Sequence, residues 1–161
     1  MMDDLFTMQT AILDAPRLVR VTCRACRLTA EVAIDAAARL CPACLADIPA
    51  TVAHLRAQEA AAFWRVDEAW WAFDAALAHA DEATQARWGA YMDAGDGPQV
   101  QETRRRVRAG LVAGPLADLI RAHVAWLDAH AQLVEMERWR HEALAELELV
   151  APNAADLYRE L

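Results

Sequence analysis

The residues of this chain best suited to chemistry are its four cysteines, which form two Cys-x-x-Cys pairs: Cys23, Cys26, Cys41 and Cys44. A Cys-x-x-Cys turn directs two sulfurs at one point, and two such turns complete the tetrahedral thiolate shell of a structural zinc site. A filled shell leaves no coordination position for a substrate. The spacing therefore predicts a structural Zn²⁺ bound by these four residues, with iron as the alternative metal.

Thiol–disulfide exchange is the other chemistry that such pairs support. A thioredoxin-like site uses one pair near a βαβ unit, and the sequence has no such alternation of strands and helices. In the cytoplasm, which is the compartment we expect, paired cysteines more often bind metal than form structural disulfides. A redox protein is therefore the second alternative to the interpretation given below.

Short elements must position the cysteine pairs. The runs at 17–23 and 27–34 contain β-branched residues in partial alternation, which predicts a hairpin with the first pair at its turn. Pro42 follows Cys41 directly, and proline suits the first position of a helix because its missing N–H needs no partner there. Pro49 is a second expected helix start.

This arrangement resembles the small zinc-ribbon and treble-clef fingers, over residues 17–50 only. The first pair on a hairpin turn and a "CPAC" pair opening a helix are more similar to a treble clef. Arg27 and Leu45 stand where glycine often follows the second cysteine in those families. Because such fingers bind nucleic acid, bind proteins or only stabilise a fold, the resemblance does not imply one function.

The rest of the chain has helical periodicity. A short helix is expected within 1–16 and a helical hairpin or bundle within 51–161, so the predicted fold is mainly α, with a small zinc module before antiparallel long helices. The expected segments are a helix at 50–93, the loop "AGDGP" at 94–98, helices at 99–112 and 115–149, and a last short helix capped by Asn153.

Composition excludes several activities. The chain has no Lys and no Ser, which removes Ser–His–Asp hydrolysis, a Lys-containing phosphate loop and Schiff-base chemistry. The histidines form no recognisable second metal site, although Glu137 and His141 are one helical turn apart. We expect no enzyme, no membrane span and no signal peptide in these 161 residues.

Tryptophans give the most unusual helical feature, "FWRVDEAWWAF". Phe63, Trp70 and Phe73 are expected on the core-facing side of the helix. Trp64 and Trp71, seven residues apart, lie about 100° away from that side. They are either covered by another part of the chain or exposed as a stripe for a protein partner.

Arginines form two candidate groups for anion or nucleic-acid contact. One group surrounds the cysteines and the other is the run "RRRVR": Arg17, Arg20, Arg24 and Arg27, and Arg104, Arg105, Arg106 and Arg108. The first group can instead offset the thiolate charge, and the second can pair with nearby carboxylates. The net charge of −8 also argues against wrapping nucleic acid as the main role.

The main interpretation is a non-enzymatic, zinc-stapled adaptor or accessory subunit that binds protein partners, or a second copy of itself, through acidic, Trp-rich helices. The alternative is a nucleic-acid-associated zinc-finger protein of a regulatory or mobile-element complex. In that case the arginine clusters contact phosphates.

Overall fold

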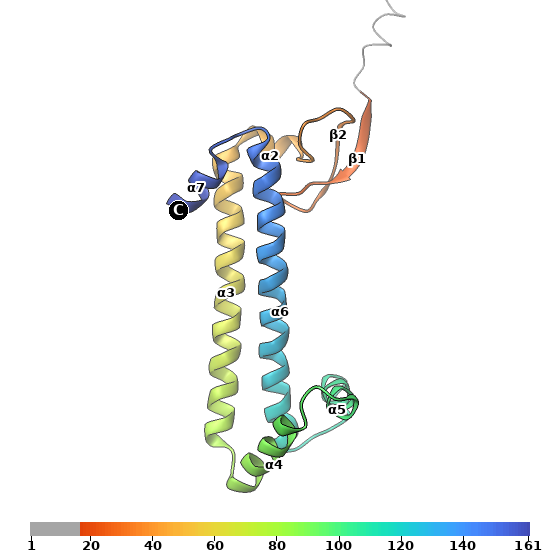
Figure 1. Ribbon diagram of the computed structural model, residues 1–161, viewed down its shortest axis with the longest axis vertical. Helices are drawn as coiled ribbons and strands as arrows, with labels where there is room; N and C mark the ends of the chain where they lie inside the picture. The colour runs from red at the N-terminus through yellow and green to blue at the C-terminus, as the bar shows by residue number, and fades with distance from the viewer. Residues whose placement is uncertain (1–16) are drawn as a thin grey trace, which may run out of the picture. The chain divides into compact units, whose positions relative to one another are not determined.

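The computed structural model describes residues 17–161, which are 70% helical and include one two-stranded antiparallel hairpin. The predicted mainly α composition, with long helices and a hairpin, is therefore confirmed. The helix expected within residues 1–16 lies outside the described residues. Figure 1 shows the elements in order: β1 (Leu18–Thr22), β2 (Thr29–Ala33), α2 (Pro42–Ala46), α3 (Ile48–His79), α4 (Glu82–Asp93), α5 (Pro98–Arg108), α6 (Pro115–Glu148) and α7 (Ala154–Glu160).

The strands β1 and β2 pair antiparallel to form the hairpin. Leu18 lies opposite Ala33, and Thr22 lies opposite Thr29, next to the turn that carries the first cysteine pair. Val32 is buried whereas Leu18 is 56% exposed, so one face of the hairpin covers the interior of the module.

A break separates α3 from α4, so the prediction of one continuous helix over 50–93 is wrong. Asp81 lies in the break, and its Oδ1 accepts a hydrogen bond of 2.7 Å from the backbone N–H of Thr84. The side chain of Gln85 donates to the carbonyl of Ala80 at 3.0 Å. These polar side chains form hydrogen bonds with backbone groups that lose their helical partners at the break. An apolar repeat does not reveal such a break.

The C-terminus of α5 is set by glycine rather than by the apolar pattern, which extended this helix to residue 112. Gly110 has a φ of 69°, a left-handed conformation that glycine adopts without steric cost. Its N–H bonds to the carbonyl of Val107 at 3.0 Å, and the N–H of Leu111 bonds to the carbonyl of Arg106 at 2.9 Å. This pair of bonds is a Schellman cap, which ends the helix before Gly110.

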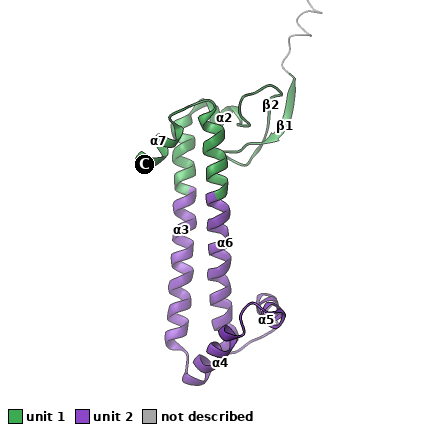
Figure 2. Ribbon diagram, viewed as in Figure 1, with its two compact units in different colours: residues 1–57, 138–161 green, residues 58–137 purple. Residues whose placement is uncertain are grey.

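The chain divides into two compact units (Figure 2). The described residues of the first unit are 17–57 and Arg138–Leu161, and the second unit is Gln58–Glu137. Both long helices contribute to both units, α3 through its two ends and α6 through its two ends. Each unit therefore contains segments that are distant in the sequence.

The first unit has a core drawn from the link after the hairpin, the start of α3 and the end of α6. Five of its fully inaccessible side chains come from these segments: Leu40, Val52, Leu55, Ala143 and Leu147. The ring of Tyr158, on α7, lies beneath the guanidinium of Arg56 at 5.2 Å. Asn153 is the N-cap residue of α7, as predicted, but its side chain makes no capping hydrogen bond.

The second unit has an apolar cluster to which α3, α4, α5 and α6 all contribute. Its buried members are Phe73, Trp88, Val107, Ala117, Leu119, Ile120 and Val124. The predicted core-facing side of α3 is only partly correct, because Phe73 is buried but Phe63 is 54% exposed and Trp70 is 42% exposed. Trp70 instead contacts the ring of Trp126 on α6 at a centroid distance of 5.4 Å.

Candidate metal centre

The first cysteine pair lies in a tight turn between β1 and β2. The N–H of Cys23 bonds to the carbonyl of Leu28 at 2.8 Å, and the N–H of Arg27 bonds to the carbonyl of Cys23 at 2.9 Å. Arg27 has a φ of 61°, which is the left-handed conformation that glycine usually supplies at such a position. The turn therefore forms with arginine in the place of glycine, at some steric cost.

The second pair opens α2 as the sequence predicted, with Pro42 in the first turn. Cys41 is the N-cap of this helix, and its sulfur accepts a bond of 3.4 Å from the N–H of Cys44. The N–H of Cys41 donates in turn to the sulfur of Cys23 at 3.2 Å. Backbone N–H groups of the second pair therefore point at sulfurs, which favours thiolate over thiol.

The four sulfurs gather at one point, with all of their Sγ atoms within 4.8 Å of one another. The Cys23–Cys44 and Cys26–Cys41 sulfur distances are 3.8 Å and 3.7 Å. A tetrahedral ion with sulfur at about 2.3 Å has edges of about 3.8 Å, whereas a disulfide places its sulfurs about 2.05 Å apart. The donor set and its spacing therefore fit a four-thiolate metal site, and no disulfide links these residues.

The protonation of the cluster is consistent with a bound cation. Burial acts to raise the pKa of Cys23, but the N–H groups of Cys26, Cys41 and Ala25 together lower it to about 7. Burial and the neighbouring sulfurs raise the pKa of Cys44. These neighbours allow one easily formed thiolate but oppose several, and a bound divalent cation would supply the charge that stabilises all four.

Three side chains on one face of α6 hold the loop around the cysteines. The indole N–H of Trp139 donates to the carbonyl of Arg24 at 2.6 Å. Glu142 pairs with the guanidinium of Arg24 at 2.8 Å, and Glu146 accepts from the N–H of Arg39 at 2.8 Å. This support was not predicted from the sequence, although the spacing of these residues by three and four along a helix is a visible signal.

Two of the arginines beside the cysteines have partners other than the sulfurs, and their contact with an anion stays a prediction. Arg24 pairs with a carboxylate on α6, and Arg27 lies over the ring of Trp139 at 4.5 Å. In the described residues, the hydrogen bonds to sulfur from outside the thiols come from backbone N–H groups. Arg17 and Arg20 are exposed on or beside β1.

Most of the second arginine group is also paired. Arg104 binds Asp96 at 2.7 Å, Arg105 pairs with Glu102, and Arg108 pairs with Asp128. Arg106 is exposed on the same helix. Three of these four residues therefore have different carboxylate partners, and contact with nucleic acid stays a prediction.

Trp64 and Trp71 are exposed on α3, at 65% and 68% of their surface. They lie on the opposite side of the helix from Phe73, which is buried in the second unit. Tryptophan is highly buried on average in proteins, so two exposed indoles one heptad apart are unusual.

Within residues 17–161, the four cysteines are the only cluster of three or more metal-ligating side chains. No helix in this part of the chain combines the length and the low polarity that crossing a membrane requires. No protein-family model matches the chain, and neither a curated protein nor a solved structure matches it.

Proposed function

We propose that this protein is a non-enzymatic adaptor or accessory subunit, stapled by one structural Zn²⁺ and built as an antiparallel bundle of α3 and α6. The sulfur distances of 3.7 Å and 3.8 Å support zinc, because they match a tetrahedral thiolate shell. A first pair on a hairpin turn and a second pair at a helix start support a treble-clef module. A closed shell supports stability rather than catalysis.

The observation that carries the proposal is the exposure of Trp64 and Trp71. An apolar side chain of this size in water favours burial against a partner, and tryptophan is enriched among the residues that dominate binding energy. Asp67 and Glu68 lie three or four residues from both tryptophans and therefore on the same side of α3. The partner surface we propose is accordingly apolar with basic residues at its edge.

The partner is a protein of the cytoplasm or a second copy of this chain. A reducing compartment favours thiolates that bind metal over thiols that form disulfides. The nearby carboxylates of α3 repel phosphate, so nucleic acid is the less favoured partner for this surface.

The test compares native protein with the double variant Trp64→Ala/Trp71→Ala in a pull-down from host extract at low salt. Captured proteins are identified by mass spectrometry, with and without nuclease treatment. The matched control is Leu111→Ala, because Leu111 is also in the second unit and is 69% exposed. Sedimentation velocity over a concentration series reports self-association of the same three proteins.

We expect native protein and the control to capture specific partners or to dimerise as concentration rises. The double variant should lose this binding while its thermal unfolding stays unchanged. Retention of the same partners by the double variant would refute the role of the tryptophans. Capture that survives the double substitution but disappears with nuclease would instead support the nucleic-acid alternative.

A further inference from the structure

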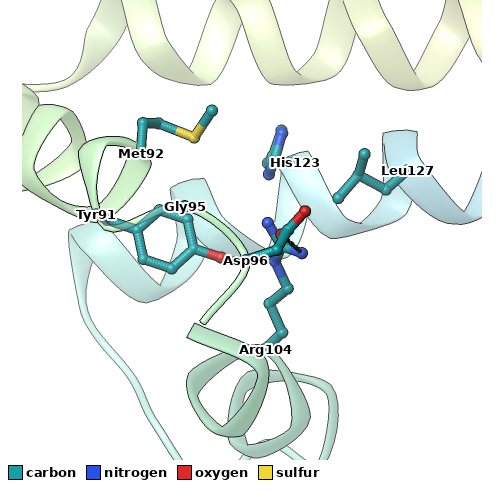
Figure 3. Close-up of a pocket in the computed structure, with 7 residues that line it drawn as sticks. All are labelled: Tyr91, Met92, Gly95, Asp96, Arg104, His123 and Leu127. Carbon is teal, nitrogen blue, oxygen red and sulfur yellow. Dashed lines mark hydrogen bonds and ion pairs between the residues drawn. The ribbon is translucent and has the colours of Figure 1, made fainter. Parts of the chain in front are cut away.

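A small cavity lies in the second unit, at a distance in sequence from the cysteines. The end of α4, the loop after it, α5 and α6 surround it, and its volume is about 230 Å³. Figure 3 shows the side chains around it, among them Tyr91, Met92, Asp96, Arg104, His123 and Leu127. Pockets for drug-sized molecules have volumes of roughly 300–1,000 Å³, so this one fits only a small ligand.

Hydrogen-bond donors exceed acceptors on the cavity wall. The guanidinium of Arg104, whose side chain is 13% exposed, donates to the hydroxyl of Tyr91 at 2.9 Å and to Asp96 at 2.7 Å. Arginine has about five N–H groups, so most of this fork has no acceptor among the described residues. The hydroxyl of Tyr91 accepts from Arg104. Its own hydrogen therefore stays available.

His123 adds a buried nitrogen to the cavity wall. The residue is 5% exposed, and its Nδ1 has no hydrogen-bond partner among residues 17–161. Its ring packs against the rings of Phe73 at 5.2 Å and Trp88 at 5.1 Å. Burial, followed by the charge of Arg104, lowers the pKa of His123, so the ring is neutral near pH 7. A buried polar atom without a partner is costly unless a bound molecule completes it.

We propose that this cavity binds a small carboxylate with a compact apolar body. The planar fork of Arg104 suits the two oxygens of a carboxylate, and Tyr91 can donate to the same group. Neutral His123 can donate or accept at Nδ1, according to its tautomer. Met92 and Leu127 supply apolar walls for the rest of the ligand.

Local charge favours a carboxylate over a phosphate. Asp96 already offsets part of the charge of Arg104, so the site has too little positive charge for a dianion. The carboxylate of Asp96 is 75% exposed, and it can remain on one side of the guanidinium while the ligand binds the other. One arginine and apolar walls therefore select a monoanion.

The test uses benzoate as the probe and benzyl alcohol as its neutral counterpart. NMR titrations of the full chain follow the amide of Gly95 and the Nε–H of Arg104. We expect saturable shifts with benzoate, and at least tenfold weaker binding of benzyl alcohol. Arg104→Gln is expected to weaken benzoate binding at least tenfold. Arg105→Gln, the matched control on the same helix, should leave it unchanged because Arg105 is exposed.

Tyr91→Phe keeps the ring and removes only the hydroxyl, so it decides the question if Arg104→Gln does not fold. We expect severalfold weaker benzoate binding in this variant. Equal shifts with both probes, equal loss in Arg104→Gln and Arg105→Gln, or no saturation with benzoate would each overturn the proposal. The last result would mean that the cavity holds only water.

Discussion

Trp139 gives the sharpest test of how α6 supports the cysteine loop. Replacing it with phenylalanine keeps an aromatic ring in the same buried place but removes the indole N–H. The variant thus loses the 2.6 Å bond to the carbonyl of Arg24. It also weakens the contact between the ring and the guanidinium of Arg27, which lies 4.5 Å from its centroid.

The expected cost follows from these two contacts. A typical hydrogen bond contributes about 0.5–1.5 kcal/mol net, and an exposed cation–π contact contributes about 0.5–1 kcal/mol. Including the smaller ring, we expect Trp139→Phe to lower the free energy of unfolding by about 2 kcal/mol. For a chain of this size, about 2–4 °C per kcal/mol gives a fall in Tm of about 4–8 °C.

The assay is thermal unfolding of zinc-loaded protein, followed by circular dichroism at neutral pH. Trp71→Phe is the matched control, because it makes the same chemical change at a residue that is 68% exposed, against 8% for Trp139. We expect the control to stay within about 0.5 kcal/mol of native protein. Equal Tm values for the two variants would refute the claim that Trp139 holds the loop.

Two further predictions concern the cysteines and His123. Removing the metal with a chelator, verified by native mass spectrometry, is expected to abolish cooperative unfolding of the first unit, because zinc binding contributes about 10–16 kcal/mol to folding in zinc-finger peptides. Unchanged helicity and Tm after verified metal loss would show that the ion does not stabilise the fold. His123→Phe is expected to raise Tm at pH 7.5 by removing a buried nitrogen without a partner. Burial holds the pKa of His123 below its ordinary value of 6.5, so native protein loses stability as the pH falls below about 6.5. The Tm advantage of the variant should therefore widen between pH 7.5 and pH 5.5. A constant difference in Tm would contradict this assignment.

The cysteine cluster was predictable from sequence because its information is local. Each Cys-x-x-Cys pair sets two sulfurs within one turn, and Pro42 marks the start of the helix that carries the second pair. The same reasoning located the loop after α4. It failed at Asp81, where a capping side chain breaks an apolar repeat that continues on both sides.

The support for the cluster was not predictable in the same way. Arg24 and Glu142 are 118 residues apart in the chain, and no local pattern pairs them. The exposed ring of Phe63 shows a second limit of periodicity. The apolar repeat identifies one face of a helix, but it does not show how much of that face a neighbouring element covers. Both outcomes depend on packing between distant segments.

The arginine contacts bear on the choice between a protein and a nucleic-acid partner. Affinity for nucleic acid depends on how many phosphates a protein can neutralise, and an arginine already beside a carboxylate contributes less to that attraction. Arg24, Arg104 and Arg108 each have such a carboxylate. Because exposed ion pairs contribute only about 0–1 kcal/mol, a phosphate could displace them, so the pairs weaken the attraction without forbidding it. Within residues 17–161 the exposed tryptophans have no comparable partner, and for that reason the adaptor proposal depends on them rather than on the arginines.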